Sequence, residues 1–102
     1  MIILTATVQA AQGKEKDLED ILRELVRKTA SEKGAVEYRL HKVAGVTGKY
    51  RFIEKFKDQA AFDLHSGSDH FKKLGAAMEP FVIENELEML ELLDSIPENQ
   101  SK

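Results

Sequence analysis

Cysteine and tryptophan are absent from this chain of 102 residues, and no stretch of it stays apolar for long. Without cysteine there is no disulfide, no thiolate metal ligand and no cysteine nucleophile, and the redox state of the surroundings stays open. No apolar run approaches the ~18 residues of a membrane span. The apolar start is followed at once by Thr5 and Thr7, with no charged leader and no cleavage site. We therefore expect no signal peptide and take the cytoplasm as the default location.

A basic surface is missing as well. The formal net charge is −3, and positive and negative residues alternate along the chain, with no lysine and arginine stripe that could neutralise phosphates. The glycine patterns that hold phosphates or dinucleotides, and the serine-hydrolase pattern GxSxG, do not occur. We therefore expect neither nucleic acid nor a membrane as a partner, and look for a small-molecule substrate.

The remaining composition is that of one globular domain. Hydrophobic residues make up 42% and charged residues 32% of the chain, a balance typical of folded domains. We expect this domain over residues 1–93 and a flexible C-terminal tail over residues 94–102. A domain of this size buries only ~65% of the surface that its unfolded chain exposes, so further burial between subunits would stabilise it.

Alternation of apolar and polar residues predicts four strands. They cover residues 2–10, 36–41, 50–56 and 84–93. The last segment is rich in good helix formers such as Glu86 and Leu87, yet its side chains also alternate. A strand is favoured there, because otherwise an edge of the sheet would stay uncovered.

A helical period separates the first two strands. Leu18, Leu22 and Leu25 lie on one stripe of a predicted helix over residues 14–33. Gly34 follows, and we expect it to end the helix by adopting a positive φ.

Two shorter helices are expected after the third strand. Asp58 can cap the first, over residues 59–66, and Ser68 or Asp69 can cap the second, which should stop near Pro80. The order is then β-α-β-β-α-β with a broken second helical region, the ferredoxin-like α+β arrangement of a four-stranded antiparallel sheet with helices on one face. The other sheet face would stay uncovered. Because an apolar uncovered face normally finds a partner, we expect a homodimer.

Three stretches of the sequence carry a family likeness. In residues 32–38 a glutamate and a glycine precede a strand that bears a tyrosine. Residues 52–58 contain an aromatic residue, a hydrophobe, a glutamate, any residue and another aromatic. Residues 60–71 contain an alanine pair, a histidine, four residues, a second histidine and an aromatic. Together they resemble the antibiotic biosynthesis monooxygenase (ABM) family, and the resemblance extends from Ile3 to about Leu92.

The resemblance implies a dimeric α+β barrel with a pocket between each sheet and its own helices. Several family members oxygenate quinols or polycyclic phenols without metal or flavin, so no cofactor is expected. Some members degrade haem, and one branch isomerises a small phosphorylated signalling sugar. The haem-degrading branch uses an asparagine on the first strand and a tryptophan. This chain has threonine and glutamine there and no tryptophan, which disfavours that branch.

Glu54 is the first candidate for a catalytic residue. It shares a strand face with Tyr50, Phe52 and Phe56, and a carboxylate on an apolar face must be hydrogen-bonded, paired or protonated, because burying it bare is costly. It could orient a histidine or act as a base. Alternatively, it pairs with an arginine or lysine, or reaches water at an edge.

His65 is the second candidate. It lies one turn after Ala61, so we expect it to face the interior, where an ordinary pKa of ~6.5 suits proton removal from a phenol or from a carbon beside a carbonyl. It could instead be a core histidine bonded to a backbone carbonyl, or a charge at a helix C-terminus.

His70 comes five residues later, which is not the spacing of a helical metal pair, and Gly67 breaks the helix between them. We therefore expect no metal site, expect His70 to line the pocket or cap a helix, and leave His41 out of the site because it faces the other side of its strand.

Aromatic residues are the candidates for substrate contacts. At their spacings Tyr38, Tyr50, Phe56 and Phe71 fill the core, and together with His70 they could line a pocket for a flat ring. The resemblance adds weight to this interpretation without selecting a substrate.

These residues lead to three functional hypotheses. In the first, a cofactor-free monooxygenase, His65 assisted by Glu54 deprotonates a quinol-like or polyphenolic substrate, and the anion reacts directly with O₂. In the second, the same pocket isomerises a small, phosphorylated hydroxyketone by proton transfer, although no arginine cluster marks a phosphate site. In the third, the chain is a non-catalytic dimeric small-molecule binder. We place the monooxygenase first.

Overall fold

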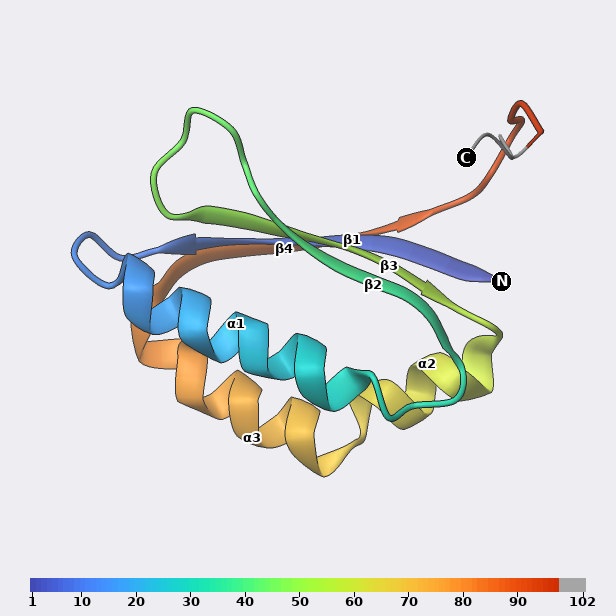
Figure 1. Cartoon of the computed structure of the whole chain (residues 1–102), viewed down its shortest axis with the longest axis horizontal. Coiled ribbons are helices and arrows are strands. Elements are labelled where there is room, and N and C mark those ends of the chain that lie inside the picture. The colour runs from blue at the N-terminus through green and yellow to red at the C-terminus, as the bar shows by residue number, and fades with distance from the viewer. Residues whose placement is uncertain (98–102) are drawn as a thin grey trace, which may run out of the picture.

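Four antiparallel strands form one sheet, and all helices lie against a single face of it, in the computed structural model, which describes residues 1–97 (Figure 1). The strands are β1 (Ile2–Ala10), β2 (Ala35–Lys42), β3 (Lys49–Phe56) and β4 (Val82–Leu90). The helices are α1 (Glu15–Thr29), α2 (Gln59–Ser66) and α3 (Asp69–Met78), followed by the 3₁₀ turn η1 (Glu79–Phe81). The strand order β2-β3-β1-β4 confirms the predicted ferredoxin-like α+β fold.

Side chains alternate between the two faces of β1, as the sequence predicts. Leu4, Val8 and Ala10 are buried under the helices, whereas Thr5 and Thr7 lie on the other face. The register places Leu4 opposite Glu54 of β3, so that this carboxyl also lies on the helix-covered face. The expected alternation on β3, which buries Tyr50, Phe52, Glu54 and Phe56, is confirmed in the same way.

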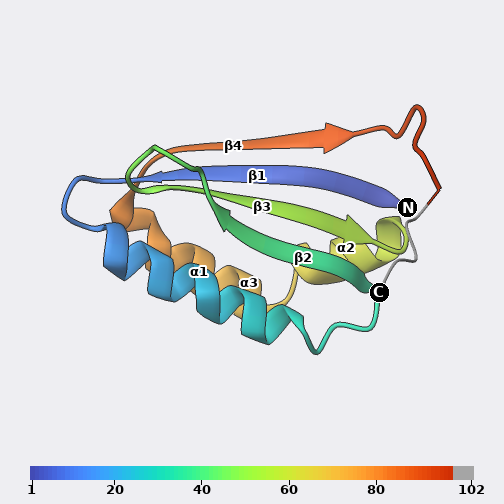
Figure 2. The same cartoon turned by 45° about the horizontal axis from the view of Figure 1, so that its top comes forward.

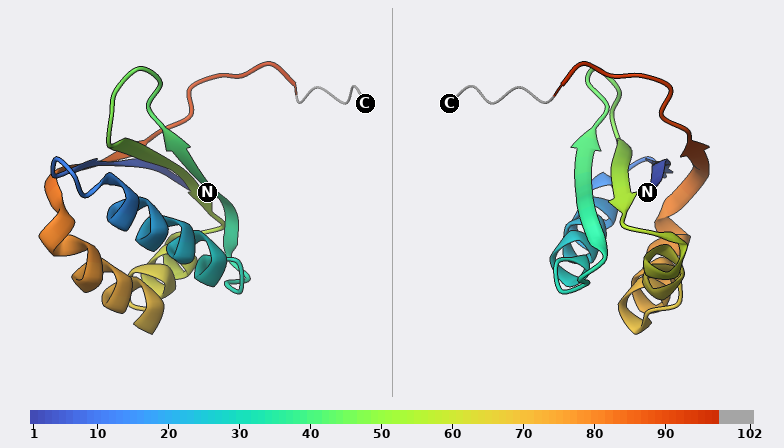
Figure 3. Two further views of the ribbon diagram at one scale, coloured as in Figure 1. Left: turned by 60° about the vertical axis from the view of Figure 1, so that its left-hand side comes forward. Right: turned by 90° about the vertical axis from the view of Figure 1, so that its right-hand side faces the viewer.

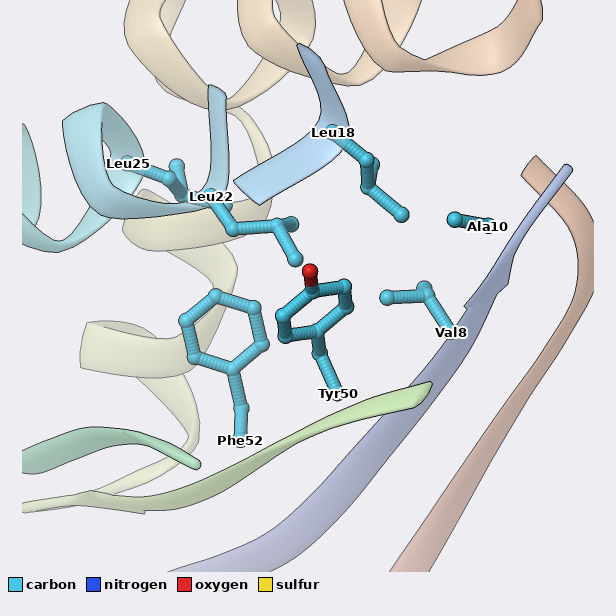
Figure 4. Packing of buried hydrophobic residues seen from close by; sticks show 7 residues of the cluster. All are labelled: Val8, Ala10, Leu18, Leu22, Leu25, Tyr50 and Phe52. Carbon is cyan, nitrogen blue, oxygen red and sulfur yellow. The ribbon is translucent and has the colours of Figure 1, made fainter. Parts of the chain in front are cut away.

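The core lies between α1 and the sheet. Leu18, Leu22 and Leu25 are fully or almost fully buried, and each contributes about 1.5–3 kcal/mol by leaving water. Figure 4 shows these side chains directed from α1 toward Val8 and Tyr50 on the sheet. The single apolar stripe of the helix is therefore the reason why α1 covers this face.

Side-chain caps fix where α2 and α3 begin. The Asp58 carboxylate accepts a hydrogen bond from the backbone N–H of Ala61, and the Ser68 hydroxyl accepts one from the N–H of Phe71. Both residues have extended backbone, as N-cap residues do. The predicted caps are confirmed, and Ser68 rather than Asp69 caps α3.

The expectation that Gly34 adopts a positive φ was wrong. Among residues 1–97 only Gly13, Gly45 and Gly48 have positive φ, and α1 ends earlier, at Thr29. Gly34 is needed for a different reason, because a Cβ at this position would overlap the Cβ of Ala61 on α2. Its missing side chain lets the α1–β2 connection pack directly against α2.

The ambiguous segment near the C-terminus is a strand. β4 pairs with β1 over its length, with Leu87 opposite Ala6 and Met89 opposite Leu4. Residues 91–97 contain no helix or strand, and the rest of the predicted tail lies outside the described residues. No helix among residues 1–97 has the length and apolar character needed to cross a bilayer.

The second face of the sheet carries no helix (Figures 2 and 3). It is less apolar than expected, because charged residues occupy most of it. On β3 the outward positions include Lys49, Arg51 and Lys55; on β4 they include Glu84, Glu86 and Glu88. The central strand between these two rows bears threonines, and we call this surface the open face.

Candidate active site

A cavity of about 130 Å³ lies between the helices and the sheet. Aliphatic and aromatic side chains form nearly all of its wall. They come from every layer around it: Leu4, Ala6, Val8, Leu22, Leu25, Tyr38, Phe52, Phe62, Phe71, Met78 and Leu87. The polar lining residues are Glu54, His65 and Ser66. Such an apolar cavity with a few polar groups is typical of a small-molecule site.

Glu54 brings a carboxyl group to the cavity wall. It is only 4% exposed, and the hydrogen bonds and ion pairs of residues 1–97 include none to its side chain. Burial, and to a lesser extent the negative charge of Glu32, raises the pKa of Glu54 to about 7. The group therefore exists in both protonation states near neutral pH, and can donate or accept a proton there.

His65 is held by a carboxylate on one side and has no partner on the other. Its Nδ1 lies 3.0 and 3.1 Å from the two carboxylate oxygens of Glu32. A carboxylate only accepts hydrogen bonds, so Nδ1 carries the proton and donates it. Nε2 is buried and has no hydrogen-bond partner among the described residues. In this tautomer Nε2 keeps its lone pair, which is the form that a general base requires.

The surroundings of His65 keep its ring neutral. The imidazole is 1% exposed, and the rings of Tyr38, Phe56 and Phe71 lie 4.9–5.1 Å from its centre. Burial lowers the pKa of His65, and the Glu32 carboxylate opposes this effect without cancelling it. Burial, together with the charge of Glu54, raises the pKa of the Tyr38 phenol, which therefore stays protonated at neutral pH.

Glu32 also binds a second histidine. Its carboxylate lies 2.5 Å from Nε2 of His70, and its side chain is only 14% exposed. The break between α2 and α3 makes this possible, because the Ser68 hydroxyl donates to the carbonyl of His65 and accepts from the N–H of Phe71. The chain turns sharply at this point, so both imidazoles reach one carboxylate although they come from different helices.

Several expected positions are corrected by the structure. The carboxylate that holds His65 belongs to Glu32, whereas the sequence suggested Glu54. Tyr50 does not line the cavity, because its hydroxyl donates to Glu19 and to the backbone carbonyl of Glu15 on α1. Phe56 and His70 are not part of the wall either.

The other expected positions agree with the structure. Tyr38, Phe71, Glu54 and His65 all line the cavity. His41 is exposed on the open face, where its Nδ1 lies 3.3 Å from the backbone carbonyl of Arg51.

The role of Glu32 as the partner of His65 was not predicted from the sequence. This residue lies in the α1–β2 connection, outside any amphipathic pattern, and 33 residues separate it from His65. The only signal was its place in the family-like stretch over residues 32–38. Chain separation of this size gives no geometric information until the fold is known.

A carboxylate-held imidazole and a second titratable carboxyl therefore border one mainly apolar cavity. This arrangement gives the α+β domain the groups that proton transfer on a small molecule requires.

Comparison with known proteins identifies the family. The chain matches the family model described as antibiotic biosynthesis monooxygenase over residues 1–77, and it belongs to this family. A Bacillus subtilis (strain 168) protein named "Putative monooxygenase YcnE" is 29% identical over 72 residues, which are 71% of this chain and 76% of that protein. Family membership and this relative support a monooxygenase-like function.

Solved structures agree with this assignment. The crystal structure of PA3566 from Pseudomonas aeruginosa has a TM-score of 0.86 and 30% identity, and the match covers 91% of this chain and 94% of that one. A crystal structure of an antibiotic biosynthesis monooxygenase has the same TM-score at 24% identity, with 92% and 100% covered. At that identity the likeness supports the fold alone.

Proposed function

We propose that this protein is a cofactor-independent monooxygenase that acts on a quinol-like substrate, with Nε2 of His65 as the base. The observation that carries the proposal is the state of His65. Glu32 fixes its Nδ1 proton, its Nε2 has no hydrogen-bond partner within residues 1–97, and the side chain lines a cavity. A buried polar atom without a partner is costly, and a substrate hydroxyl in the cavity would satisfy it.

The reaction begins with proton transfer. A phenolic O–H of the substrate gives its proton to Nε2, and the imidazolium that forms is stabilised by the Glu32 carboxylate. The electron-rich anion passes one electron to O₂, and the two radicals recombine at a ring carbon to form a peroxide. The C–H bond of that ring carbon then breaks together with the O–O bond, and the C–H electrons form a carbonyl with the oxygen that stays. The other oxygen leaves as water with two protons, the one first taken from the substrate O–H and the one from the C–H bond. The substrate supplies all the electrons.

Glu54 can take part in the same sequence. With a pKa of about 7, its neutral form would donate a hydrogen bond to a substrate oxygen or a proton to the departing peroxide oxygen. We propose it as the general acid opposite His65, in place of the assisting role expected from the sequence. Tyr38 and Phe71 would hold the ring by aromatic contact.

The size of the cavity narrows the substrate class. Its volume of about 130 Å³ is close to the ~150 Å³ engineered cavity known to bind benzene, and far below the ~300–1,000 Å³ of drug-sized sites. A single-ring quinol fits this space with little rearrangement. A polycyclic phenol would require the wall to open, so we propose one-ring substrates.

A homodimer is part of the proposal, through the open face. The basic row on β3 and the acidic row on β4 lie on either side of the central strand β1. A two-fold axis that runs parallel to β1, between two open faces packed together, would bring the basic row of each copy against the acidic row of the other. Light scattering of the purified protein tests this: a mass of two chains that falls to one in Arg51→Glu supports it, and a monomeric wild type refutes it.

Oxygen uptake tests the catalytic proposal. Metal-stripped protein is given a panel of one-ring and polycyclic quinols, and His65→Ala and Glu32→Gln are compared with wild type. His41→Ala is the matched control, because it removes an exposed histidine far from the cavity. Uptake that disappears in His65→Ala and persists in His41→Ala supports the proposal. Equal uptake in wild type and His65→Ala removes this base from the mechanism.

An isomerase is the second candidate, and one observation favours it. Glu54, with a pKa of about 7, and the neutral imidazole of His65 border the same cavity, and proton transfer beside a carbonyl needs no oxygen. Exchange of substrate C–H for solvent deuterium without oxygen uptake would support this reading. Saturable binding with neither reaction would leave a small-molecule binder.

A further inference from the structure

Glu32, His65 and His70 form a set of ligands as well as a hydrogen-bonded cluster. Their Nδ1, Nε2 and carboxylate oxygen atoms all lie within 4.8 Å of one another, and among residues 1–97 they are the one such group of three. Two imidazoles and a carboxylate are the ligands that zinc takes in many enzymes. In the sequence, the five-residue spacing of the two histidines and the helix break at Gly67 both argued against a metal site. In the structure that break brings the two imidazoles to the same carboxylate.

We propose that this cluster binds a divalent transition-metal ion such as Zn²⁺, and that the bound ion switches His65 from base to hydrogen-bond donor. The second half of this proposal deepens the function proposed above and depends on it. The first half, the metal site, stands on the geometry of the three side chains alone.

The geometry is close to that of a zinc site. Ligand atoms about 2.1 Å from a tetrahedral ion are roughly 3.4 Å apart, and the carboxylate oxygen of Glu32 lies 3.0 Å from His65 and 2.5 Å from His70. To hold the ion, the Glu32 oxygen has to move about 1 Å or less away from each histidine, and the two imidazole nitrogens, which lie within 4.8 Å of each other, have to adopt the same spacing. Entry from solvent is open on one side, because the side chain of His70 is 21% exposed. Water would supply the fourth ligand.

Metal binding changes which nitrogen of His65 carries the proton. Without metal, Nδ1–H donates to Glu32 and Nε2 keeps its lone pair. A metal on Nδ1 takes the lone pair of that nitrogen, so the proton of the neutral ring moves to Nε2. An Nε2–H group cannot accept a proton from the substrate. The metal therefore acts as an inhibitor by selecting the wrong tautomer, without entering the cavity.

Metal titration tests the site without any need for turnover. Calorimetry with Zn²⁺ and visible absorption with Co²⁺ are measured on wild type, His70→Asn and His41→Asn. We expect one ion per chain with intense, tetrahedral-type cobalt bands in wild type and His41→Asn, and an affinity at least about tenfold weaker in His70→Asn. Circular dichroism confirms that His70→Asn is folded, and His70→Gln serves as a second variant. Equal zinc affinity in wild type and both His70 variants would overturn the site.

Two further readouts test the switch. Nitrogen-15 NMR of the histidine side chains should report a protonated Nε2 in His65 only after zinc is added; no change in tautomer on saturation overturns the switch. The turnover rate with zinc is then compared with the rate without zinc in each protein. In wild type we expect zinc to lower the rate at least tenfold, and chelation to restore it. In His70→Asn zinc should lower the rate by a smaller factor. Undiminished turnover of the zinc-saturated wild type overturns inhibition. If no quinol is turned over at all, the proposed function fails, while the titration and the NMR still decide the metal site and the tautomer.

Discussion

Replacement of Glu54 by glutamine should change how the stability of this protein depends on pH. The carboxyl is buried in the cavity wall, and its pKa rises from 4.5 to about 7 on folding. The folded chain thus keeps a proton that the unfolded chain releases between these pH values. The stabilisation from this group is complete below about pH 4.5 and is lost as the pH rises through 7. At about 1.4 kcal/mol per pKa unit, the loss reaches about 3 kcal/mol.

Glutamine resembles the protonated carboxyl in shape but cannot ionise. We therefore expect Glu54→Gln and wild type to unfold at similar urea concentrations at pH 5, where the wild-type carboxyl is largely protonated. At pH 8 the variant should be more stable by about 3 kcal/mol, which for a domain of this size raises Tm by roughly 10 °C or more. His65 titrates in both proteins, so its contribution cancels when the two free energies of unfolding are subtracted.

The assay is urea unfolding followed by circular dichroism at several pH values from 5 to 8. Asp17→Asn is the control, because it removes one negative charge from an exposed position on α1, away from the open face. If the difference between Glu54→Gln and wild type is the same at pH 5 and pH 8, the reasoning is refuted. Glu54 would then be ionised in the folded protein and unsuited to the role of a general acid.

Three further predictions concern other parts of the molecule. Glu32→Gln should lower kcat by about 10²- to 10⁴-fold with little change in KM, because the glutamine amide no longer selects the tautomer of His65. Steady-state oxygen uptake measures kcat and KM, and an unchanged kcat would contradict the role of His65 as the base. Gly34→Ala should destabilise the fold by about 1–3 kcal/mol, because the added Cβ overlaps Ala61. Gly75→Ala in α3 should stabilise the fold by up to about 1 kcal/mol, because a Cβ added there meets nothing within 4 Å. Thermal unfolding measures the stability of both variants, and equal effects would refute the steric explanation. One-ring quinols should have higher kcat/KM than polycyclic phenols by at least about tenfold, since the latter exceed the cavity of about 130 Å³; the reverse order would show that the wall opens readily.

Most of the fold could be predicted because its determinants are local. Alternation along β1 and β3, the apolar stripe of α1 and the Asp58 cap each depend on residues close together in the chain. The strand nature of β4 needed one non-local argument, the uncovered sheet edge. Gly34 was misjudged because its requirement comes from Ala61, which lies far away in sequence and approaches only after folding.

The site could be predicted only in part, for a related reason. His65, Glu54, Tyr38 and Phe71 were recognised because strand and helix faces determine which side chains point inward. The partner of His65 could not be found in this way, because Glu32 lies in a connection and periodicity says nothing about connections. Tyr50 was misplaced since a residue on the correct face can still lie at the wrong end of the strand, here beneath α1 rather than at the cavity.

The break between α2 and α3 has a consequence for redesign of this protein. The three residues of the imidazole–carboxylate cluster come from two short connections and the helix ends beside them, whereas most of the cavity wall comes from the sheet and from α1. Wall residues of the sheet such as Ala6, Val8 and Leu87 can therefore be exchanged without disturbing the proton-transfer group. A library restricted to these positions would vary the accepted ligand while the chemistry stays constant, so one scaffold could serve many differently shaped molecules.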